Sequence, residues 1–425
     1  MYKLFILAFY YLFIVFIYIY KMADNIAENA INGIGKAQEA FKNMIKDKNK
    51  WLMLYLILII IFIVWLLFWY IRSKIMLKEV NNKNMEYNLT TISGSGISGI
   101  NSGNPNHSHK LRDYYMASSY NSCCGGSTQK DFVDKKPLKM VIGRGARLLD
   151  FEIYSLNGSP VVAAGPEPSK NGKFCLKGTY NSIPFKEVMN EVRKRAFSGG
   201  KGGAPNPDDP LVLNFRIKTS TGNIYPSMAN TMRQVFGGMF LPSKYSNEGQ
   251  NITKGLEVIP NIPLLELKRK IIVCCTDPNM NFRDTEFHEF VNISGKGKKG
   301  GGMPFAKMYK NIDIVQTYDS KSLVEENKKF LAITMPDFSS QNTNPPAVIH
   351  HKFGCQWVMM NYSNIDTNFE YYNNFFRSAG SAFRLKPDHL RYFETVIAVP
   401  KKQDPRLSMG PKRASALGGA YKPFV

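Results

Sequence analysis

The chain has 425 residues, of which 44% are hydrophobic and 13% aromatic, and its formal net charge is +22. This length and composition allow at least one large buried core, and six cysteines that include two adjacent pairs exclude a secreted disulfide framework. The excess of positive charge indicates an anionic partner, which is acidic lipid, nucleic acid or an acidic protein surface.

Two segments precede the clearest membrane span. Residues 1–21 are apolar and aromatic, and they are either a second span or the apolar part of a signal peptide. A third interpretation is an upstream extension, because Met22 opens a sequence that reads as an ordinary protein start. Residues 22–50 place apolar side chains three and four apart between lysines, which predicts an amphipathic basic helix. We expect this helix to lie on a lipid surface rather than against a partner helix.

Residues 51–71 contain no charged side chain and are long enough to cross the hydrocarbon layer, so we predict a transmembrane helix. Basic residues flank both ends, and the charge pattern therefore gives no orientation. Residues 72–112 are rich in Asn, Ser and Gly, which predicts a flexible linker. His107 and His109 within it are expected to be solvated, since no cysteine or carboxylate is placed to complete a metal site.

The most informative stretch is residues 143–165, which read GRGARLLDFEIYSLNGSPVVAAG. Apolar residues alternate on both sides of Asn157-Gly158, which predicts a strand, a turn and a second strand. Asp150 and Glu152 stand two positions apart and therefore share one face of the first strand. These carboxylates are either solvated side chains of an exposed face or parts of a site.

This stretch resembles the second catalytic strand of the X region of phosphoinositide-specific phospholipase C. The resemblance rests on an arginine, an acidic pair, a Gly-x-Pro-Val turn and a final glycine, which are Arg147, Asp150, Glu152, Gly158, Pro160, Val161, Val162 and Gly165. Residues 116–122 resemble the family's first catalytic strand, and residues 211–219 resemble the strand that carries a metal-binding glutamate. Tyr120 and Ala164 stand in place of the two family histidines, and Arg216 stands in place of the glutamate.

The later part of the chain resembles the Y region of the same family. Residues 353–362 are similar to its Gly-Cys-Gln strand, and within residues 330–336 Ile333 and Met335 hold the places of a substrate-binding arginine and tyrosine. The resemblance implies an α/β fold, a distorted (β/α)8 TIM-type barrel of the X-Y kind. The expected divisions are an X-like half at 113–275, an inter-half linker at 276–311, a Y-like half at 312–397 and a basic tail at 398–425.

The residues at the three replaced positions, Tyr120, Ala164 and Arg216, decide whether we expect proton transfer and metal binding. Two histidines suit the proton transfers of phosphodiester cleavage because imidazole titrates near neutrality, whereas alanine does not titrate. The resemblance also implies a calcium site, and we expect calcium to be lost because Arg216 repels the ion or pairs with a carboxylate. We therefore expect no catalytic residue and no metal, and remnants of a substrate pocket at Asn121, Asp150, Glu152, Arg216, Ile333 and Met335.

The favoured interpretation is a membrane-anchored, catalytically inactive phospholipase C-like protein that acts as a structural or interaction module. Such inactive proteins with an N-terminal membrane segment are similar to proteins of large DNA viruses, which indicates a viral-membrane or virion component. The expected partners are the membrane, anionic lipid head groups and a protein partner for the basic tail, with no specific nucleic acid, and cysteine usage favours a cytosol-facing barrel. The alternatives are an active phosphodiesterase with a rebuilt site and a basic surface that binds anionic lipid or nucleic acid.

Overall fold

The computed structural model describes residues 50–92, 96–166, 177–220, 222–246, 258–295, 306–338 and 342–394. It divides into two compact units, Met1–Lys83 and Asn84–Val425, which are described separately below. The predictions for residues 1–21, for the basic helix at 22–49 and for the tail at 398–425 lie outside the described residues.

The described residues of the first unit belong to helix α2 (Lys50–Thr91). Every side chain from Tyr55 to Ile71 is exposed, and none of them is charged. Such a continuous apolar surface is unfavourable in water but matches the hydrocarbon layer of a membrane. The helix from Tyr55 to Thr91 is long and apolar enough to cross a membrane, with a mean hydropathy of 2.4 over its most apolar window. The predicted helix at 51–71 is confirmed.

The predicted flexible linker at 72–112 is wrong over most of its length. Helix α2 continues through Thr91, and Met85 and Leu89 are buried one helical turn apart. Beyond the helix, the His107 side chain is buried rather than solvated, and its Nδ1 accepts a hydrogen bond of 3.1 Å from the backbone N–H of Asn101. The polar composition misled the prediction because a few well-spaced apolar side chains and local side-chain hydrogen bonds are enough to order this segment.

Eight parallel strands form a nearly closed barrel, and the order around it is β8-β7-β6-β3-β2-β11-β10-β9. The strands are β2 (Ser118–Ser119), β3 (Leu148–Leu156), β6 (Leu211–Ile217), β7 (Ile271–Thr276), β8 (Val291–Ser294), β9 (Ala306–Lys310), β10 (Leu331–Met335) and β11 (Trp357–Met360). Within the described residues, no pairing joins β8 to β9, which are consecutive in the chain. The predicted (β/α)8-type barrel is therefore confirmed, with its opening between these two strands.

The predicted inter-half linker at 276–311 contains two strands of the barrel, β8 and β9. Strand β8 is only four residues long, and β9 has two lysines among its five residues, so neither shows a clear apolar pattern. Each is recognisable only through its neighbour, because β8 pairs with β7 and β9 pairs with β10. The prediction of a linker at 276–311 is therefore wrong where these two strands lie, because both belong to the barrel.

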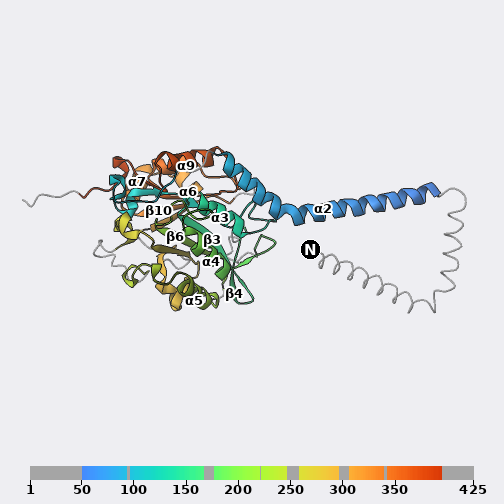
Figure 1. Cartoon of the computed structure of the whole chain (residues 1–425), viewed down its shortest axis with the longest axis horizontal. Helices are drawn as coiled ribbons and strands as arrows, with labels where there is room; N and C mark the ends of the chain where they lie inside the picture. The colour runs from blue at the N-terminus through green and yellow to red at the C-terminus, as the bar shows by residue number, and fades with distance from the viewer. Residues whose placement is uncertain are drawn as a thin grey trace, which may run out of the picture. The chain divides into compact units, whose positions relative to one another are not determined.

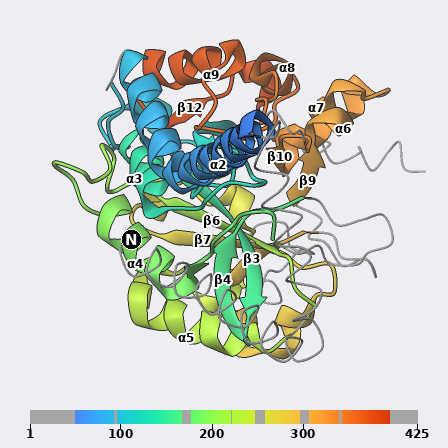
Figure 2. The ribbon, with the colours of Figure 1, turned by 90° about the vertical axis from the view of Figure 1, so that its right-hand side faces the viewer.

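Helices surround the barrel, and Figure 2 shows α3, α4 and α5 along one part of its rim and α8 and α9 along another. The helices are α3 (Lys135–Gly143), α4 (Phe185–Ala196), α5 (Ile224–Phe236), α6 (Asn311–Val315), α7 (Ser320–Lys329), α8 (Ala347–Lys352) and α9 (Thr367–Ser378). In α4 the buried side chains recur three and four positions apart, which is the spacing of an amphipathic helix that packs one face against the barrel. Aspartates accept hydrogen bonds from first-turn N–H groups of α3, α7 and α9, as expected of N-caps.

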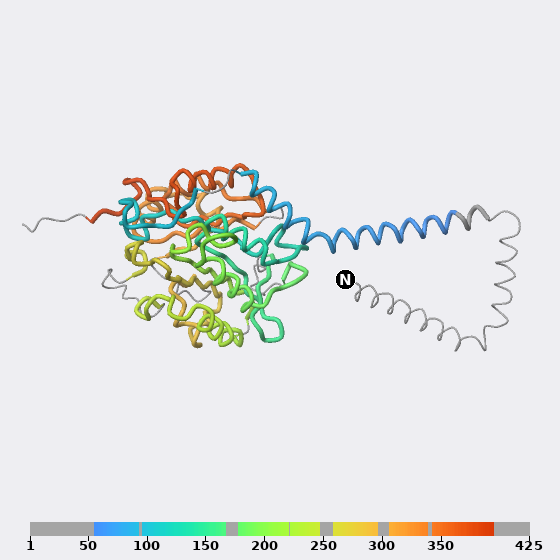
Figure 3. Tube along the Cα trace, viewed as in Figure 1, coloured from blue at the N-terminus to red at the C-terminus, as the bar shows by residue number. Residues whose placement is uncertain are grey.

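Two short pairings complete the fold. The predicted turn after β3 is confirmed, with Asn157 and Gly158 at φ 50° and 79°, and β4 (Ser159–Ala163) returns antiparallel to β3 and pairs with β5 (Ile183–Pro184). Strand β1 (Tyr114–Met116) pairs antiparallel with β12 (Phe383–Leu385), which ties the start of the second unit's sheet structure to its end. Figure 3 shows these two chain regions, teal and orange-red, side by side.

The alternation of β3 divides its side chains between the barrel interior and the helix layer. Phe151 lies 6.2 Å from Phe215 of β6, and Phe215 lies 5.4 Å from Phe185 of α4, measured between ring centroids. Because Phe185 belongs to α4, these rings face the helix layer, whose helices α3, α4 and α5 are labelled in Figure 1. Asp150 and Glu152 consequently face the interior, opposite Asn214 and Arg216 in the register of β3 with β6.

Candidate functional site

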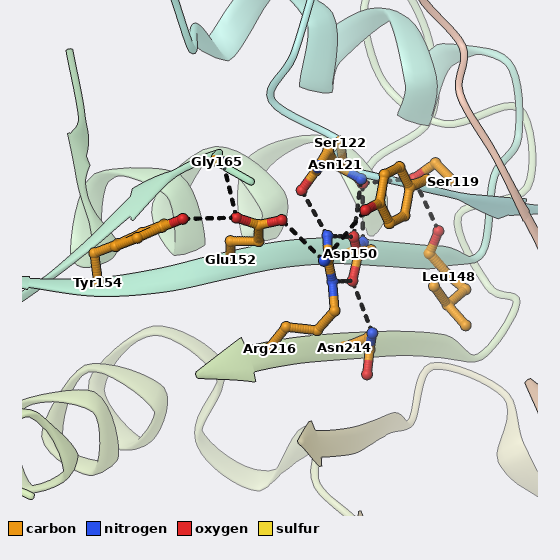
Figure 4. Close-up of polar contacts among 11 residues, drawn as sticks. Ser119, Asn121, Ser122, Leu148, Asp150, Glu152, Tyr154, Gly165, Asn214 and Arg216 are labelled. Atoms are coloured by element: carbon orange, nitrogen blue, oxygen red, sulfur yellow. Dashed lines mark hydrogen bonds and ion pairs between the residues drawn. The ribbon is translucent and has the colours of Figure 1, made fainter. Parts of the chain in front are cut away.

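Arg216 of β6 is the centre of a buried polar site inside the barrel. Its Nε and Nη2 donate to the two carboxylate oxygens of Asp150 at 2.9 and 2.7 Å, and its Nη1 donates to Glu152 Oε1 at 2.9 Å. Nη2 also donates to the side-chain oxygen of Asn121 at 2.8 Å, and Nη1 to the Tyr120 hydroxyl at 3.3 Å. Figure 4 shows the guanidinium reaching from β6 to the carboxylates on β3. One arginine of β6 thus joins β3 and the turn after β2.

Further donors saturate both carboxylates. Asp150 Oδ1 accepts from Asn214 Nδ2 at 2.7 Å, and Oδ2 accepts from the backbone N–H of Asn121 at 2.9 Å. Glu152 Oε2 accepts from the Tyr154 hydroxyl at 2.9 Å and from the backbone N–H of Gly165 at 3.0 Å. All four carboxylate oxygens therefore accept hydrogen bonds from protein groups, which is what buried charges require.

The electrostatics favour the ionised arginine. Burial alone would lower the pKa of Arg216, but the carboxylates of Asp150 and Glu152 outweigh burial and raise this pKa well above its ordinary value. Burial raises the pKa of the Tyr120 hydroxyl, although the nearby Arg216 opposes the shift. The Arg216 guanidinium carbon also lies 4.5 Å from the centroid of the Tyr120 ring, a cation–π distance. Tyr120 is therefore a neutral partner of the arginine near neutral pH.

The backbone places Asn121 in the site in an uncommon conformation. Its φ of 43° lies in the left-handed region, which asparagine tolerates better than most residues. This conformation aims both its N–H at Asp150 and its side-chain oxygen at Arg216. Next to it, Ser122 Oγ accepts from the backbone N–H of Asp150 at 2.9 Å, so the turn after β2 is fixed to β3 at several points.

The donor set of this site does not fit a calcium ion. Calcium takes six to eight oxygen ligands at about 2.3–2.6 Å, with carboxylates among them. Here a permanent cation lies within hydrogen-bond distance of both Asp150 and Glu152 and uses three of their four oxygens. A divalent ion at the same carboxylates would meet this charge at close range.

Ala164, at the second position where the resemblance implies a histidine, has no titratable side chain. It is fully buried after β4, and its carbonyl accepts hydrogen bonds from the backbone N–H groups of Gly178 and Thr179 at 2.8 and 3.0 Å. Gly178 is closely packed as well, since a Cβ there would lie 2.9 Å from the carbonyl oxygen of Thr128.

Ile333 and Met335 do not join the Arg216 network. They lie on β10, which is separated from β3 by β11 and β2 in the order of the barrel. The Ile333 side chain is fully buried in the apolar core, and Met335 packs against the same core. The structure therefore brings Tyr120, Asn121, Asp150, Glu152 and Arg216 together and leaves these two apart.

Among the described residues, asparagine side chains join the loops that follow β2, β10 and β11. Asn342 Nδ2 donates to the carbonyl of Gly126 at 2.8 Å, and Asn361 Nδ2 donates to the carbonyl of Asn342 at 3.1 Å. Among the described residues, the pocket next to Tyr120 that Asn342 and Asn361 line has a volume of about 10 Å³. This is room for one water molecule, far below the size of a pocket for an organic ligand.

Two residues of the network were missed from the sequence. Asn214 stands two positions before Arg216, and Tyr154 stands two positions after Glu152, so each continues the inward-facing alternation of its strand. Following every second residue along β3 from Glu152, and along β6 from Arg216, would have identified both residues. Arg147, by contrast, is buried at the start of β3, where it donates to the carbonyl of Ala196 at 2.9 Å and does not reach the site.

A nearly closed parallel barrel with a polar site near the carboxyl ends of its strands defines a TIM-type α/β barrel. The model of the phosphatidylinositol-specific phospholipase C X domain matches residues 107–275, so the chain has a phospholipase C-like fold. The crystal structures of PLC21 from L. pealei and S. officinalis are each 17% identical to this chain, both with a TM-score of 0.52. They match over 67% and 68% of this chain, which spans only 38% of either relative.

A calcium-dependent phosphoinositol-specific phospholipase C from Pseudomonas sp is 10% identical over 66% of this chain and 97% of its own, with a TM-score of 0.40. No curated protein matches the sequence. The likeness to the two PLC21 structures, at 17% identity, shows the fold alone, and the chemistry must be argued from the site itself.

Proposed function

We propose that this chain is a membrane-anchored phospholipase C-like protein without phosphodiesterase activity, which serves as a structural or interaction module. The observation that carries the proposal is the buried ion pair of Arg216 with Asp150 and Glu152. At the position where the resemblance implies a metal ligand, a cation belonging to the protein itself neutralises the carboxylates.

The groups available for proton transfer support the same proposal. Cleavage of a phosphodiester by an internal hydroxyl needs a base for that hydroxyl and an acid for the leaving oxygen. Tyr120 has a raised pKa and lies against Arg216, and Ala164 has no proton to exchange. Each general acid or base typically contributes about 10²- to 10⁴-fold to the rate, so the loss of both removes most of the catalysis.

The proposal includes the absence of bound calcium. Asp150 and Glu152 would have to exchange the guanidinium for the ion, and the buried Arg216 would keep only its neutral partners, Asn121 and Tyr120. Breaking a buried ion pair in this way typically costs about 3–5 kcal/mol. Within the described residues, the pocket beside Tyr120 has a volume of about 10 Å³, which is too small for an inositol phosphate head group.

The proposal also includes where the protein is located and what it binds. The exposed apolar helix α2 supports attachment to a membrane, and the net charge of +22 supports contact with anionic lipid head groups. We propose a viral-membrane or virion component, with the basic tail at 398–425 binding a protein partner and the barrel facing the cytosol. Cysteines that are free and buried in the described residues fit a reducing compartment.

The test uses the full chain in lipid nanodiscs. Calorimetric titration with Ca²⁺ should give no binding heat for the natural chain, whereas Arg216→Glu should bind calcium because it adds a carboxylate ligand and removes the cation. The melting temperature of Arg216→Glu should likewise rise with calcium, and that of the natural chain should not. Arg216→Gln serves as a neutral control that should neither bind calcium tightly nor gain stability from it.

The activity assay measures release of inositol phosphates from phosphatidylinositol vesicles. No release above the vesicle blank is expected with or without calcium. Calcium-dependent release by the natural chain would replace the proposal with an active enzyme that has a rebuilt site. A salt-steep, sequence-independent affinity for nucleic acid would instead favour the basic-surface alternative.

A further inference from the structure

An aromatic pocket lies between helices α8 and α9 and strand β12, and it shares no residue with the Arg216 site. Its volume is about 460 Å³, within the range of small-molecule sites. We define the aromatic pocket by the rings of Tyr115, His351, Tyr371 and Phe375 and by the guanidinium of Arg384, all of which line it. Figure 2 shows α8, α9 and β12 next to one another at the edge of the barrel unit.

The rings form a preassembled wall. His351 lies stacked against Phe375, with ring centroids 4.2 Å apart, and the Tyr115 ring lies 4.6 Å from His351. Tyr371 extends the wall, 5.9 Å from Phe375. The hydroxyl of Tyr115 donates to the carbonyl of His351 at 2.7 Å, which fixes α8 to β1. A wall held in this way loses little side-chain entropy when a ring stacks against it.

His351 is unusual among the described residues. Its side chain is more than nine-tenths buried, yet neither ring nitrogen has a hydrogen-bond partner. Burial, together with the charges of His350 and Arg384, lowers the pKa of His351 to about 3, so the imidazole is neutral at physiological pH. An unpaired neutral imidazole in the floor of a pocket is suited to stacking rather than to ion pairing.

The charges around the pocket have one sign. The Arg384 guanidinium carbon lies 4.1 Å from the Phe375 ring centroid, and the group is held by hydrogen bonds to the Phe375 carbonyl at 2.7 Å and to Ser378 Oγ at 3.0 Å. Lys352 and His389 also line the pocket, and both are exposed. None of the described lining residues is acidic. A ligand therefore meets an apolar aromatic wall beside cations that no lining carboxylate neutralises.

We propose that the aromatic pocket binds a small aromatic anion, whose ring stacks on Tyr371 and whose phosphate or carboxylate pairs with Arg384 and Lys352, since His351 and Arg384 already cover the two faces of Phe375. A neutral aromatic molecule would leave the cations without a partner, and an inorganic anion would leave the rings exposed to water. The pairing of a ring with a negative group is what this set of side chains selects.

The probe is phenyl phosphate, observed by saturation-transfer NMR on the full chain in nanodiscs, with empty nanodiscs as the blank. Benzyl alcohol tests the ring alone, and inorganic phosphate tests the charge alone. Phenyl phosphate should bind at least about tenfold more tightly than either, since a charge-assisted hydrogen bond adds to the stacking. Failure to detect phenyl phosphate binding at about 10 mM would overturn the proposal.

Substitutions locate the binding. Lys352→Gln changes an exposed side chain and should fold normally, yet it should weaken phenyl phosphate binding about tenfold, as should Arg384→Gln. Val348→Glu, at a half-exposed lining position, should abolish binding through charge and bulk. The matched control is Lys136→Gln on α3, an equally exposed lysine outside the pocket, and it should have no effect. Equal weakening by Lys136→Gln would overturn the site and indicate general attraction to a basic surface. These results do not depend on calcium or on cleavage of phosphatidylinositol, so the proposed function and this site fail separately.

Discussion

At the residue scale, Arg216 is held by two carboxylates and two neutral groups in the barrel interior. Removing the cation while keeping most of the side-chain length, as in Arg216→Met, leaves the carboxylates of Asp150 and Glu152 buried on one face of β3 without a charged partner. We expect this variant to lose about 3–5 kcal/mol of the free energy of unfolding, measured by urea denaturation.

The matched control for that substitution is Arg233→Met. Arg233 is half exposed and pairs with Glu286 at 3.2 Å on the surface, where solvent screens the interaction. Its loss should cost less than about 1 kcal/mol. Similar costs for the two variants would contradict the expectation that breaking the buried ion pair of Arg216 costs more than breaking an exposed one.

Lys386 is a second buried cation, and it predicts a pH dependence. Its Nζ donates to the carbonyl of Asn327 at 2.8 Å, and burial lowers its pKa to about 7, although Asp113 opposes the shift. The unfolded chain holds this proton up to about pH 10.4, so between pH 7 and 10 the unfolded state binds more protons than the folded state. The penalty for charging Lys386 is therefore complete below pH 7 and is relieved as the pH rises.

The measurement compares the natural chain with Lys386→Met from pH 6 to pH 10. Relative to the variant, the natural chain should gain about 1.4 kcal/mol per pH unit between pH 7 and 10, because other titrating groups are common to both proteins. Parallel stability curves for the two proteins would show that the Lys386 pKa is not lowered.

At the element scale, alternation along strands was the reliable signal. It predicted β3, the turn at Asn157-Gly158 and β4, because apolar residues at every second position leave no competing helix pattern. It also placed Asp150 and Glu152 on one face, and the resemblance added Arg216 from a strand more than 60 residues away. Their contact depends on the register of β3 with β6, which local spacing does not contain.

Short or polar elements could not be predicted from the sequence, for a physical reason. Strand β8 has four residues, too few for a period to appear, and its place follows from pairing with β7. The end of α2 reads as a polar linker, although Met85 and Leu89 provide enough apolar surface to order it. The ring cluster around His351 was also missed, because it joins β1, α8 and α9 from distant parts of the chain.

At the scale of the whole molecule, the proposed attachment to the membrane would depend on the exposed apolar surface of α2. Each arginine placed at the centre of a spanning helix costs about 2.5–3.5 kcal/mol on insertion scales. The double substitution Ile60→Arg and Val64→Arg, one helical turn apart, should therefore release a chain that starts at Met22 from membranes. Vesicle flotation and alkaline extraction measure the bound fraction, and Tyr318→Arg, on the exposed surface of the barrel unit, is the control that should stay bound.

The same substitutions in the chain that starts at Met1 separate a single span from two. If residues 1–21 form a second span, this longer chain stays in the membrane when α2 carries both arginines, whereas an upstream extension without membrane affinity is released with it. Retention of the Met22 chain after both substitutions would contradict α2 as the anchor. Attachment would then have to come from the basic helix at 22–50 and from contacts of the barrel with anionic lipid, and it would be lost at high salt because such contacts are screened.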